Sequence, residues 1–220
     1  MARLLPQWLR RLNGAIFRLS TRIFAPNSPW KRLKFPVPVT AFGLGSHRQF
    51  AEYFDGESRV PVESIESIIE WLLTCEYATD VDLFHERDVW QHPSAFEELR
   101  RGDCEDFALW AWRKLAEIGI DAEFYVGRVM PDGDPDIVRQ HAWVMYHVDG
   151  APFLFEPAAR TQQQMIRPLA DVRTRYVPHF AVDRRFRTWA FRGCLLDSTS
   201  DRGRQRQTPP GSRLPQAFLR

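Results

Sequence analysis

A hairpin signal at Asp149-Gly150 constrains the fold more tightly than any other feature of this 220-residue sequence. An Asp-Gly pair favours a tight two-residue turn. Two runs with strand propensity flank it, HAWVMYHV at 141–148 and FLFE at 153–156. The turn type fixes the register of the strands that it joins. The sequence therefore predicts an antiparallel pair of strands in this region.

Helical patterns precede these strands along the chain. Apolar residues recur with helical spacing in residues 62–77, and a proline opens a short helix over 93–101 that we expect Gly102 to end. A longer helix is predicted over 103–118, followed by a strand at 122–130. Helices followed by strands predict an α+β domain in which an antiparallel sheet packs on a helix.

Cys104 occupies the first turn of the longer helix. Asp103 can cap this helix, and Asp106 completes an acidic version of the capping box. The unpaired N–H groups and partial positive charge of a helix N-terminus favour a thiolate, so we expect the pKa of Cys104 to lie well below its usual value. The same N–H groups could hold an oxyanion. The alternative interpretation is a small apolar side chain packed in the core.

His141 and Glu156 are expected to lie on one face of the hairpin. With a two-residue turn, Glu156 stands opposite Trp143, and residues 141 and 143 of one strand share a face. His141 and Glu156 are then diagonal neighbours, roughly 7–8 Å apart at the backbone and within side-chain reach. A four-residue loop preserves this arrangement and a three-residue loop breaks it. A cysteine nucleophile needs a base such as His141, and a carboxylate can orient the imidazole.

Three segments carry a resemblance to a known family: WQHPSAFEELRRGDCEDFA at 90–108, HAWV at 141–144 and FLFEP at 153–157. Together they resemble the transglutaminase-like superfamily, and in particular the bacterial transglutaminase-like cysteine proteinases. The resemblance covers about residues 62–160. It implies a papain-like α+β core, in which a helix that carries the nucleophile packs on an antiparallel sheet.

The reaction that the resemblance implies is thiol-dependent acyl transfer on a protein or peptide amide, by a triad of Cys104, His141 and Glu156. The family usually has Asp in the third position. Hydrolysis, by a cysteine peptidase or amidase, is favoured over transamidation. Two other functions stay open. One is a catalytically silent binding or scaffold module, and the other is a leader-peptide maturation protease, because GIDAEFYVG at 119–127 followed by HAWV also resembles those enzymes.

Further roles are assigned close to the nucleophile. Trp90 and Gln91 are candidate oxyanion donors, through an indole N–H and a side-chain amide, with ordinary packing as the alternative. Some relatives bind calcium through acids beside the cysteine, and Asp103 and Glu105 match these positions, although acids at a helix start also act as caps. No other cofactor is expected. The Asp-rich segment at 131–137 is interpreted as a solvated turn.

The charges are distributed unevenly along the chain. Residues 1–34 hold eight Lys/Arg and no Asp/Glu, and residues 160–220 hold thirteen Arg and four Asp, although the formal net charge of the whole chain is only +2. The part between them is therefore acidic, and an acidic body is a poor partner for nucleic acid. A protein or peptide substrate is the expected partner.

We expect four parts: a basic amphipathic helix at 1–24, a Pro-rich extension at 25–61, the transglutaminase-like domain at 62–197 and a disordered basic tail at 198–220. The N-terminal helix could dock on the domain or lie on an anionic membrane surface. Three cysteines suggest free thiols and no disulfide framework. No run of 18 apolar residues is present, so no membrane-spanning helix is expected. Arginines interrupt the first apolar stretch, which is not typical of a signal peptide. A cytoplasmic location, with peripheral membrane contact as an option, is the resulting expectation.

Overall fold

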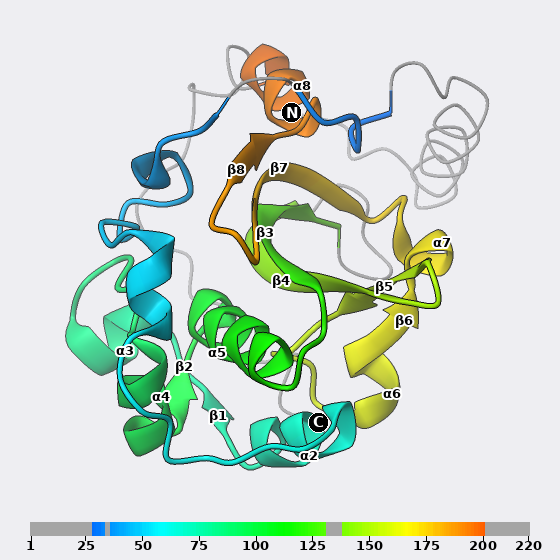
Figure 1. Cartoon of the computed structure of the whole chain (residues 1–220). Coiled ribbons are helices and arrows are strands. Elements are labelled where there is room, and N and C mark those ends of the chain that lie inside the picture. The colour runs from blue at the N-terminus through cyan, green and yellow to red at the C-terminus, as the bar shows by residue number, and fades with distance from the viewer. Residues whose placement is uncertain (1–27, 34–35, 131–137, 201–220) are drawn as a thin grey trace, which may run out of the picture.

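The computed structural model describes residues 28–33, 36–130 and 138–200, and Figure 1 shows how their elements are arranged. The first half is mainly helical: η2 (Val39–Ala41), η3 (Phe50–Phe54), α2 (Ile65–Leu72), β1 (Glu76–Tyr77), α3 (Asp80–Phe84), α4 (Pro93–Leu99), β2 (Arg101–Gly102) and α5 (Cys104–Glu117). The second half is mainly strands: β3 (Ala122–Val129), β4 (Arg139–Val148), β5 (Ala151–Phe155), α6 (Gln162–Met165), β6 (Ile166–Pro168), α7 (Leu169–Val172), β7 (Tyr176–Asp183), β8 (Thr188–Ala190) and α8 (Gly193–Ser200).

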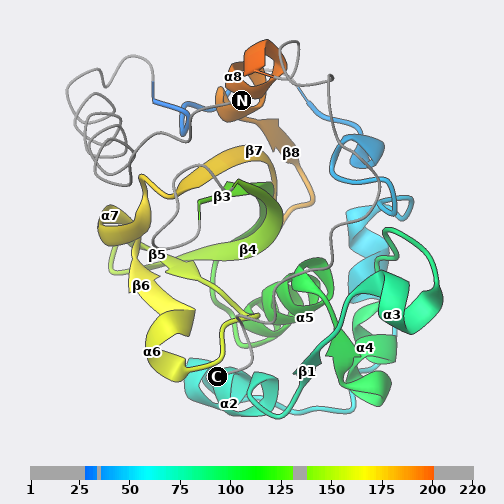
Figure 2. The ribbon, with the colours of Figure 1, turned by 180° about the vertical axis from the view of Figure 1, so that it is seen from behind.

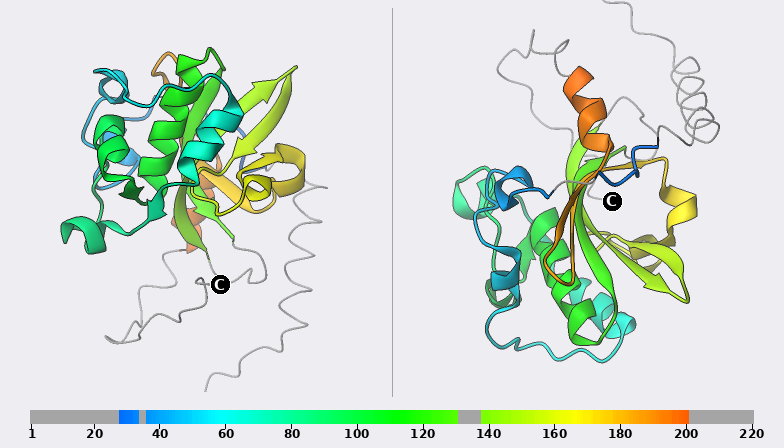
Figure 3. Two further views of the ribbon diagram at one scale, coloured as in Figure 1. Left: turned by 90° about the horizontal axis from the view of Figure 1, so that it is seen from below. Right: turned by 45° about the horizontal axis from the view of Figure 1, so that its top comes forward.

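The strands of the second half form one antiparallel sheet in the order β6-β5-β4-β3-β7-β8. Helix α5 lies against the central strands β3 and β4, as both views of Figure 3 show, and α2 and α4 also pack against α5. Seen from behind, β7 and β8 lie at the top of the sheet, and β6 forms its other edge (Figure 2). The predicted α+β fold, with a helix packed on an antiparallel sheet, is therefore confirmed.

The β4–β5 hairpin has the register that the sequence predicts. Val148 pairs with Ala151 and Val144 pairs with Phe155, so the connection is the two-residue turn Asp149-Gly150. Both turn residues have positive φ, 51° at the aspartate and 79° at the glycine. These angles belong to a turn whose twist matches that of the two strands, and glycine adopts them without steric cost.

Helix α4 ends earlier than the sequence predicts. Its C-cap is Arg100, which adopts a left-handed conformation with φ of 52°, whereas Gly102 already belongs to strand β2. The glycine is needed for another reason. A Cβ atom there would lie 2.3 Å from Oδ2 of Asp106, far inside van der Waals contact. Because Asp106 also accepts the backbone N–H of Asp103, this close approach fixes the start of α5.

Strand alternation divides the apolar residues between two faces of the sheet. The face toward α5 presents Phe124, Val126, Ala142, Val144 and Tyr146. The opposite face presents Tyr125, Trp143, Met145 and Ala181, and Trp30 and Phe191 cover it. Both faces of the central strands are consequently buried, which explains why β3 and β4 read as nearly continuous apolar runs.

The segment that the sequence analysis assigned to a Pro-rich extension takes part in this packing. Phe42, Phe50 and Tyr53 are buried in the same core cluster as α5. The backbone of Arg32 forms an isolated antiparallel β-bridge with Phe191. The indole N–H of Trp30 donates to the carbonyl of Arg173 at 3.1 Å. The packed structure therefore begins well before residue 62.

Some expectations concern residues outside the described ranges. They are the amphipathic helix at 1–24 with its membrane surface, the turn at 131–137, and the basic tail beyond Ser200. In the described ranges, no helix has both the length and the apolar character needed to cross a membrane.

Candidate functional site

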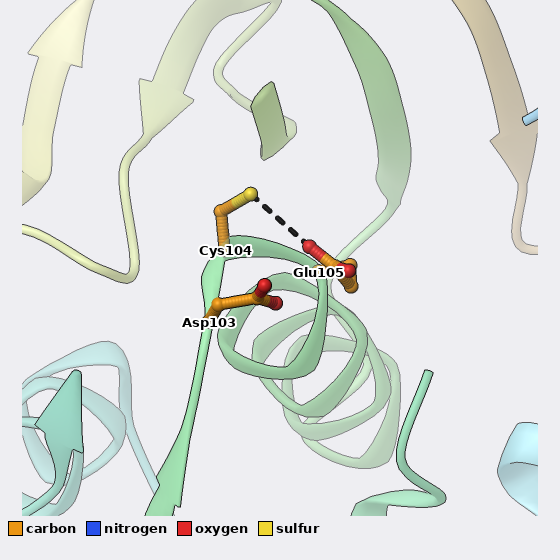
Figure 4. Close-up of side chains that lie close together, drawn as sticks. All are labelled: Asp103, Cys104 and Glu105. Carbon is orange, nitrogen blue, oxygen red and sulfur yellow. Dashed lines mark hydrogen bonds between the residues drawn. The ribbon is translucent and has the colours of Figure 1, made fainter. Parts of the chain in front are cut away.

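Cys104 is the first residue of α5, and its side chain projects from the first helical turn (Figure 4). The thiol donates a hydrogen bond to Oε2 of Glu105 at 3.1 Å. The backbone N–H of Ala142 donates to the sulfur. Since Ala142 directly follows His141 in β4, the start of the helix and the histidine strand meet at this point.

His141 and Glu156 are in direct contact, as the hairpin register predicts. Nε2 of His141 lies 2.7 Å from Oε2 of Glu156, and both side chains are largely buried. The hydroxyl of Tyr176, from the start of β7, donates to the same carboxylate oxygen at 3.0 Å. The imidazole ring also stacks on Trp143, with ring centroids 6.3 Å apart and planes 22° apart. Its orientation is therefore fixed from two sides, and Nδ1 is the nitrogen not engaged by Glu156.

The pKa of His141 is raised above its ordinary value. Burial on its own would lower this pKa, but the charge of Glu156, its hydrogen bond, and the charge of Asp103 together outweigh burial. The protein around His141 thus stabilises its imidazolium form more than water would, which makes the neutral imidazole a stronger base.

The pKa of Cys104 is raised well above its ordinary value, which contradicts the prediction of a lowered thiol pKa. Burial is the largest cause, followed by the negative charges of Glu105 and Asp103, and only the hydrogen bond from Ala142 acts in the opposite direction. The prediction considered the helix N-terminus and left out burial and the carboxylates of Asp103 and Glu105. Burial and neighbouring negative charges both disfavour a thiolate.

Five carboxylates gather at the N-terminal end of α5. Asp80, Asp103 and Asp106 have oxygen atoms within 4.8 Å of one another, and so do Asp80, Asp88 and Glu105. In the described part of the chain, no lysine or arginine forms an ion pair with any of these five acids. Among the described residues, the arrangement therefore concentrates acidic groups without a Lys or Arg partner.

Several features of this acid cluster (Asp80, Asp88, Asp103, Glu105 and Asp106) fit a hard divalent cation. Oδ1 of Asp80 and Oδ1 of Asp103 are buried and have no hydrogen-bond partner in the described structure. Burial and the charges of Asp103 and Asp88 raise the pKa of Asp80 to about 6. Burial and the charge of Asp103 likewise raise the pKa of Asp106 to about 8, despite hydrogen bonds from Gln91. Clustered carboxylate oxygens of this kind are calcium ligands in proteins.

The donor groups of the two candidate oxyanion residues are engaged within the protein. The indole N–H of Trp90 donates to Oδ1 of Asp88 at 2.8 Å. The amide nitrogen of Gln91 donates to Oδ2 of Asp106 at 2.5 Å and to the carbonyl of Arg101 at 2.9 Å. In this geometry both residues hold the acid cluster in place, and the oxyanion role remains a prediction.

Sequence reasoning missed three residues that the fold brings to the site. Asp80 and Asp88 come from helix α3 and the loop after it, and Tyr176 comes from β7. The acid-rich stretch TDVDLFHERDVW offered a weak signal for the two aspartates. Nothing in the local sequence distinguishes Tyr176, because its place depends on the pairing of β7 with β3.

Comparison with known proteins identifies a family for the central part of the chain. Residues 48–154 match the model of the transglutaminase-like superfamily. No curated protein matches the chain. Calcium-bound LapG of Legionella pneumophila is a similar solved structure, with 18% identity and a TM-score of 0.43 over 61% of this chain and 72% of LapG. A candidate cysteine protease from Cytophaga hutchinsonii has 13% identity and a TM-score of 0.36 over 71% of this chain and 61% of its own. On the family match, the chain contains a domain of the transglutaminase-like superfamily at residues 48–154.

Proposed function

We propose that the protein is a cysteine hydrolase that cleaves a protein or peptide amide, with Cys104 as nucleophile, His141 as base and Glu156 as the acid that orients His141. The observation that carries this proposal is the 2.7 Å contact between Nε2 of His141 and Glu156, beside a thiol that accepts the N–H of Ala142. Together they leave Nδ1 of His141 for proton exchange with the thiol.

In the first half of the reaction, Nδ1 of His141 takes the proton of Cys104 as the sulfur attacks the amide carbonyl carbon. A C–S bond forms and the carbonyl oxygen becomes an oxyanion. The N–H groups of the first α5 turn are the proposed donors to this oxyanion. When the intermediate collapses, the C–N bond breaks and His141 gives its proton to the leaving amine. A thioester on Cys104 remains.

In the second half, a water molecule gives a proton to His141 and attacks the thioester carbon. The C–S bond breaks, the carboxylic acid product leaves, and His141 returns the proton to the sulfur. An amine in place of water would give transamidation. Glu156 stabilises the imidazolium in both halves, because its carboxylate faces Nε2 at 2.7 Å.

The test compares the wild-type protein with Cys104→Ala on a cell lysate. New peptide N-termini, identified by mass spectrometry, should appear with the wild type and be absent with the variant. A Cys194→Ala variant should behave as the wild type, because Cys194 is a half-buried thiol in α8 and is not part of the triad. A fluorescent primary amine added in parallel reports transamidation.

A chain that is folded, gives no new N-termini, incorporates no amine and is not labelled by a thiol probe would be a binding module instead. Cleavage of a single peptide, at the end of an N-terminal leader segment, would favour the maturation-protease alternative. Each function thus has its own outcome in the same experiment.

We further propose that the acid cluster binds Ca²⁺. The buried and unpartnered oxygens of Asp80 and Asp103, with Asp88, Glu105 and Asp106, would provide the ligands. A bound cation would supply positive charge beside Cys104. That charge would offset the two carboxylates that now raise the pKa of Cys104.

A further inference from the structure

The carboxylate of Glu156, which must keep one orientation to act on His141, is hydrogen-bonded through only one of its two oxygens in the described structure. Its backbone is fixed, since its N–H donates to the carbonyl of Met165 at 2.7 Å. Its side chain has only two hydrogen bonds in the described structure, and both end on Oε2, from His141 and from Tyr176. Oε1 is buried and has no partner there. The position of the carboxylate therefore depends on the two donors to one oxygen.

Glutamate has one more rotatable bond than aspartate, so it is less restricted when it approaches an imidazole. A second donor on a rigid element compensates for this freedom. Tyr176 is 5% exposed and begins strand β7, where it pairs with Val129. Its ring packs edge-on against Trp143, with centroids 5.2 Å apart, and Trp143 stacks on His141. The hydroxyl of Tyr176 is thus held in a fixed position relative to the imidazole.

We propose that Tyr176 is a positioning residue, whose hydroxyl holds Oε2 of Glu156 against Nε2 of His141. This inference rests on the proposed function for its biological meaning, because it assigns Tyr176 a role in keeping the base oriented. The contact that it concerns is present whether or not Cys104 performs chemistry.

The pKa of His141 reports this role directly. Burial lowers that pKa, and the charge and hydrogen bond of Glu156, together with the charge of Asp103, more than compensate. If the carboxylate swings away when the tyrosine hydroxyl is removed, the effect of burial prevails and the pKa of His141 falls. A tyrosine that only fills space would leave the pKa unchanged after its hydroxyl is removed.

The experiment measures the imidazole titration of His141 by NMR in the full-length wild type, Tyr176→Phe, Glu156→Gln and the double variant. The expected result is a fall of about half a unit to one unit in Tyr176→Phe, which is a three- to tenfold change in proton affinity. The double variant should titrate like Glu156→Gln alone, because Tyr176 acts through Glu156. An unchanged or raised pKa of His141 in Tyr176→Phe, or an added effect in the double variant, would overturn the proposal.

Tyr125→Phe is a matched control. Tyr125 is 4% exposed and donates to a glutamate, Oε2 of Glu123, at 2.6 Å, but it lies on β3 and its partner is not Glu156. Its removal should leave the titration of His141 unchanged. Alkylation of Cys104 by iodoacetamide, measured on the same samples, separates the two proposals. A Cys104 that stays unreactive in the wild type in millimolar Ca²⁺ counts against the hydrolase, whereas the response of His141 alone decides the role of Tyr176.

Discussion

The two ends of helix α5 both carry buried charges, but only one end balances them. At the C-terminal end, Lys114 donates to the carbonyl of Val60 at 2.6 Å and to Glu117 at 2.9 Å, and it lies 3.4 Å from Glu97. Arg113 donates to Glu117 and to the carbonyls of Asp55 and Gly56. At the N-terminal end, the five carboxylates of the acid cluster repel one another.

This difference distinguishes a network that stabilises the fold, around Lys114, from a candidate binding site, the acid cluster. A buried lysine with two carboxylates and a carbonyl has its charge and its hydrogen bonds satisfied by the protein, so it ties the segment around residues 55–60 to the helix. A buried group of acids is incomplete in protein atoms alone, and perturbed titration of this kind is concentrated at functional sites. The following predictions test this difference, beginning with the largest effect.

Lys114→Met should reduce the free energy of unfolding by about 3–5 kcal/mol, because it leaves the buried carboxylate of Glu97 without its countercharge. Urea denaturation followed by tryptophan fluorescence measures this loss. Adding Glu97→Gln to Lys114→Met should restore part of it. A loss below about 1 kcal/mol would mean that the network is not balanced in the way described.

The acid cluster should make the cation-free protein more stable as the pH falls. Folding raises the pKa of Asp106 to about 8 and that of Asp80 to about 6, so the folded state binds protons that the unfolded state releases. The stabilisation is complete near pH 4 and is lost as the pH rises through about 6 and 8. Melting temperatures in EGTA should accordingly rise from pH 8 to pH 5.

Asp80→Asn is the matched variant for this experiment. It removes one charge and retains an acceptor for the N–H of Val89, so it should stabilise the chelated protein at pH 8 by about 1–3 kcal/mol. Saturating Ca²⁺ should flatten the pH dependence of the wild type and affect the variant less. Melting curves that show no pH trend, with or without Ca²⁺, would contradict the cluster as a cation site.

Calcium should increase the reactivity of Cys104 at neutral pH. Burial and the charges of Glu105 and Asp103 raise the thiol pKa, and a cation between these carboxylates would offset the two charges. The pH midpoint of iodoacetamide alkylation should fall by about one unit or more on adding millimolar Ca²⁺, which is about 1.4 kcal/mol per unit. Cys194, followed in the same digest by mass spectrometry, should show no shift. Equal midpoints with Ca²⁺ and with EGTA would contradict the prediction that a cation at the acid cluster lowers the thiol pKa.

The smallest effect is expected on the surface near the balanced end. Arg59 pairs with Glu98 at 2.7 Å, but the two side chains are 75% and 58% exposed. Arg59→Ala should change the free energy of unfolding by less than about 0.5 kcal/mol, because exposed ion pairs contribute little. Urea denaturation of Arg59→Ala and Lys114→Met under the same conditions compares the two losses. A much larger loss in Lys114→Met would show that the buried ion pair contributes more to the free energy of unfolding than the exposed one.

Local patterns predicted the helix start and the hairpin, whereas non-local packing escaped prediction. The contact between the side chains of His141 and Glu156 could be predicted from the two-residue turn. The turn fixes the register of β4 and β5, and the register determines which residues share a face. The positions of Asp80 and Asp88 depend on how α3 and its following loop pack against α5, which no sequence spacing encodes. The pKa of Cys104 was predicted in the wrong direction because burial, the largest cause of its shift, depends on the packed structure, and because the flanking carboxylates were not counted.

The contact between Gly102 and Asp106 has a consequence for how mutations are tolerated. Any side chain at position 102 would displace Asp106 and the amide of Gln91, which lies 2.8 Å from the position of a Cβ atom. Those two residues hold one another through two hydrogen bonds, so a displacement there would spread to the helix start that presents Cys104. In a saturation-mutagenesis library, position 102 should therefore be as intolerant of substitution as a catalytic position, even though its own side chain is a single hydrogen atom.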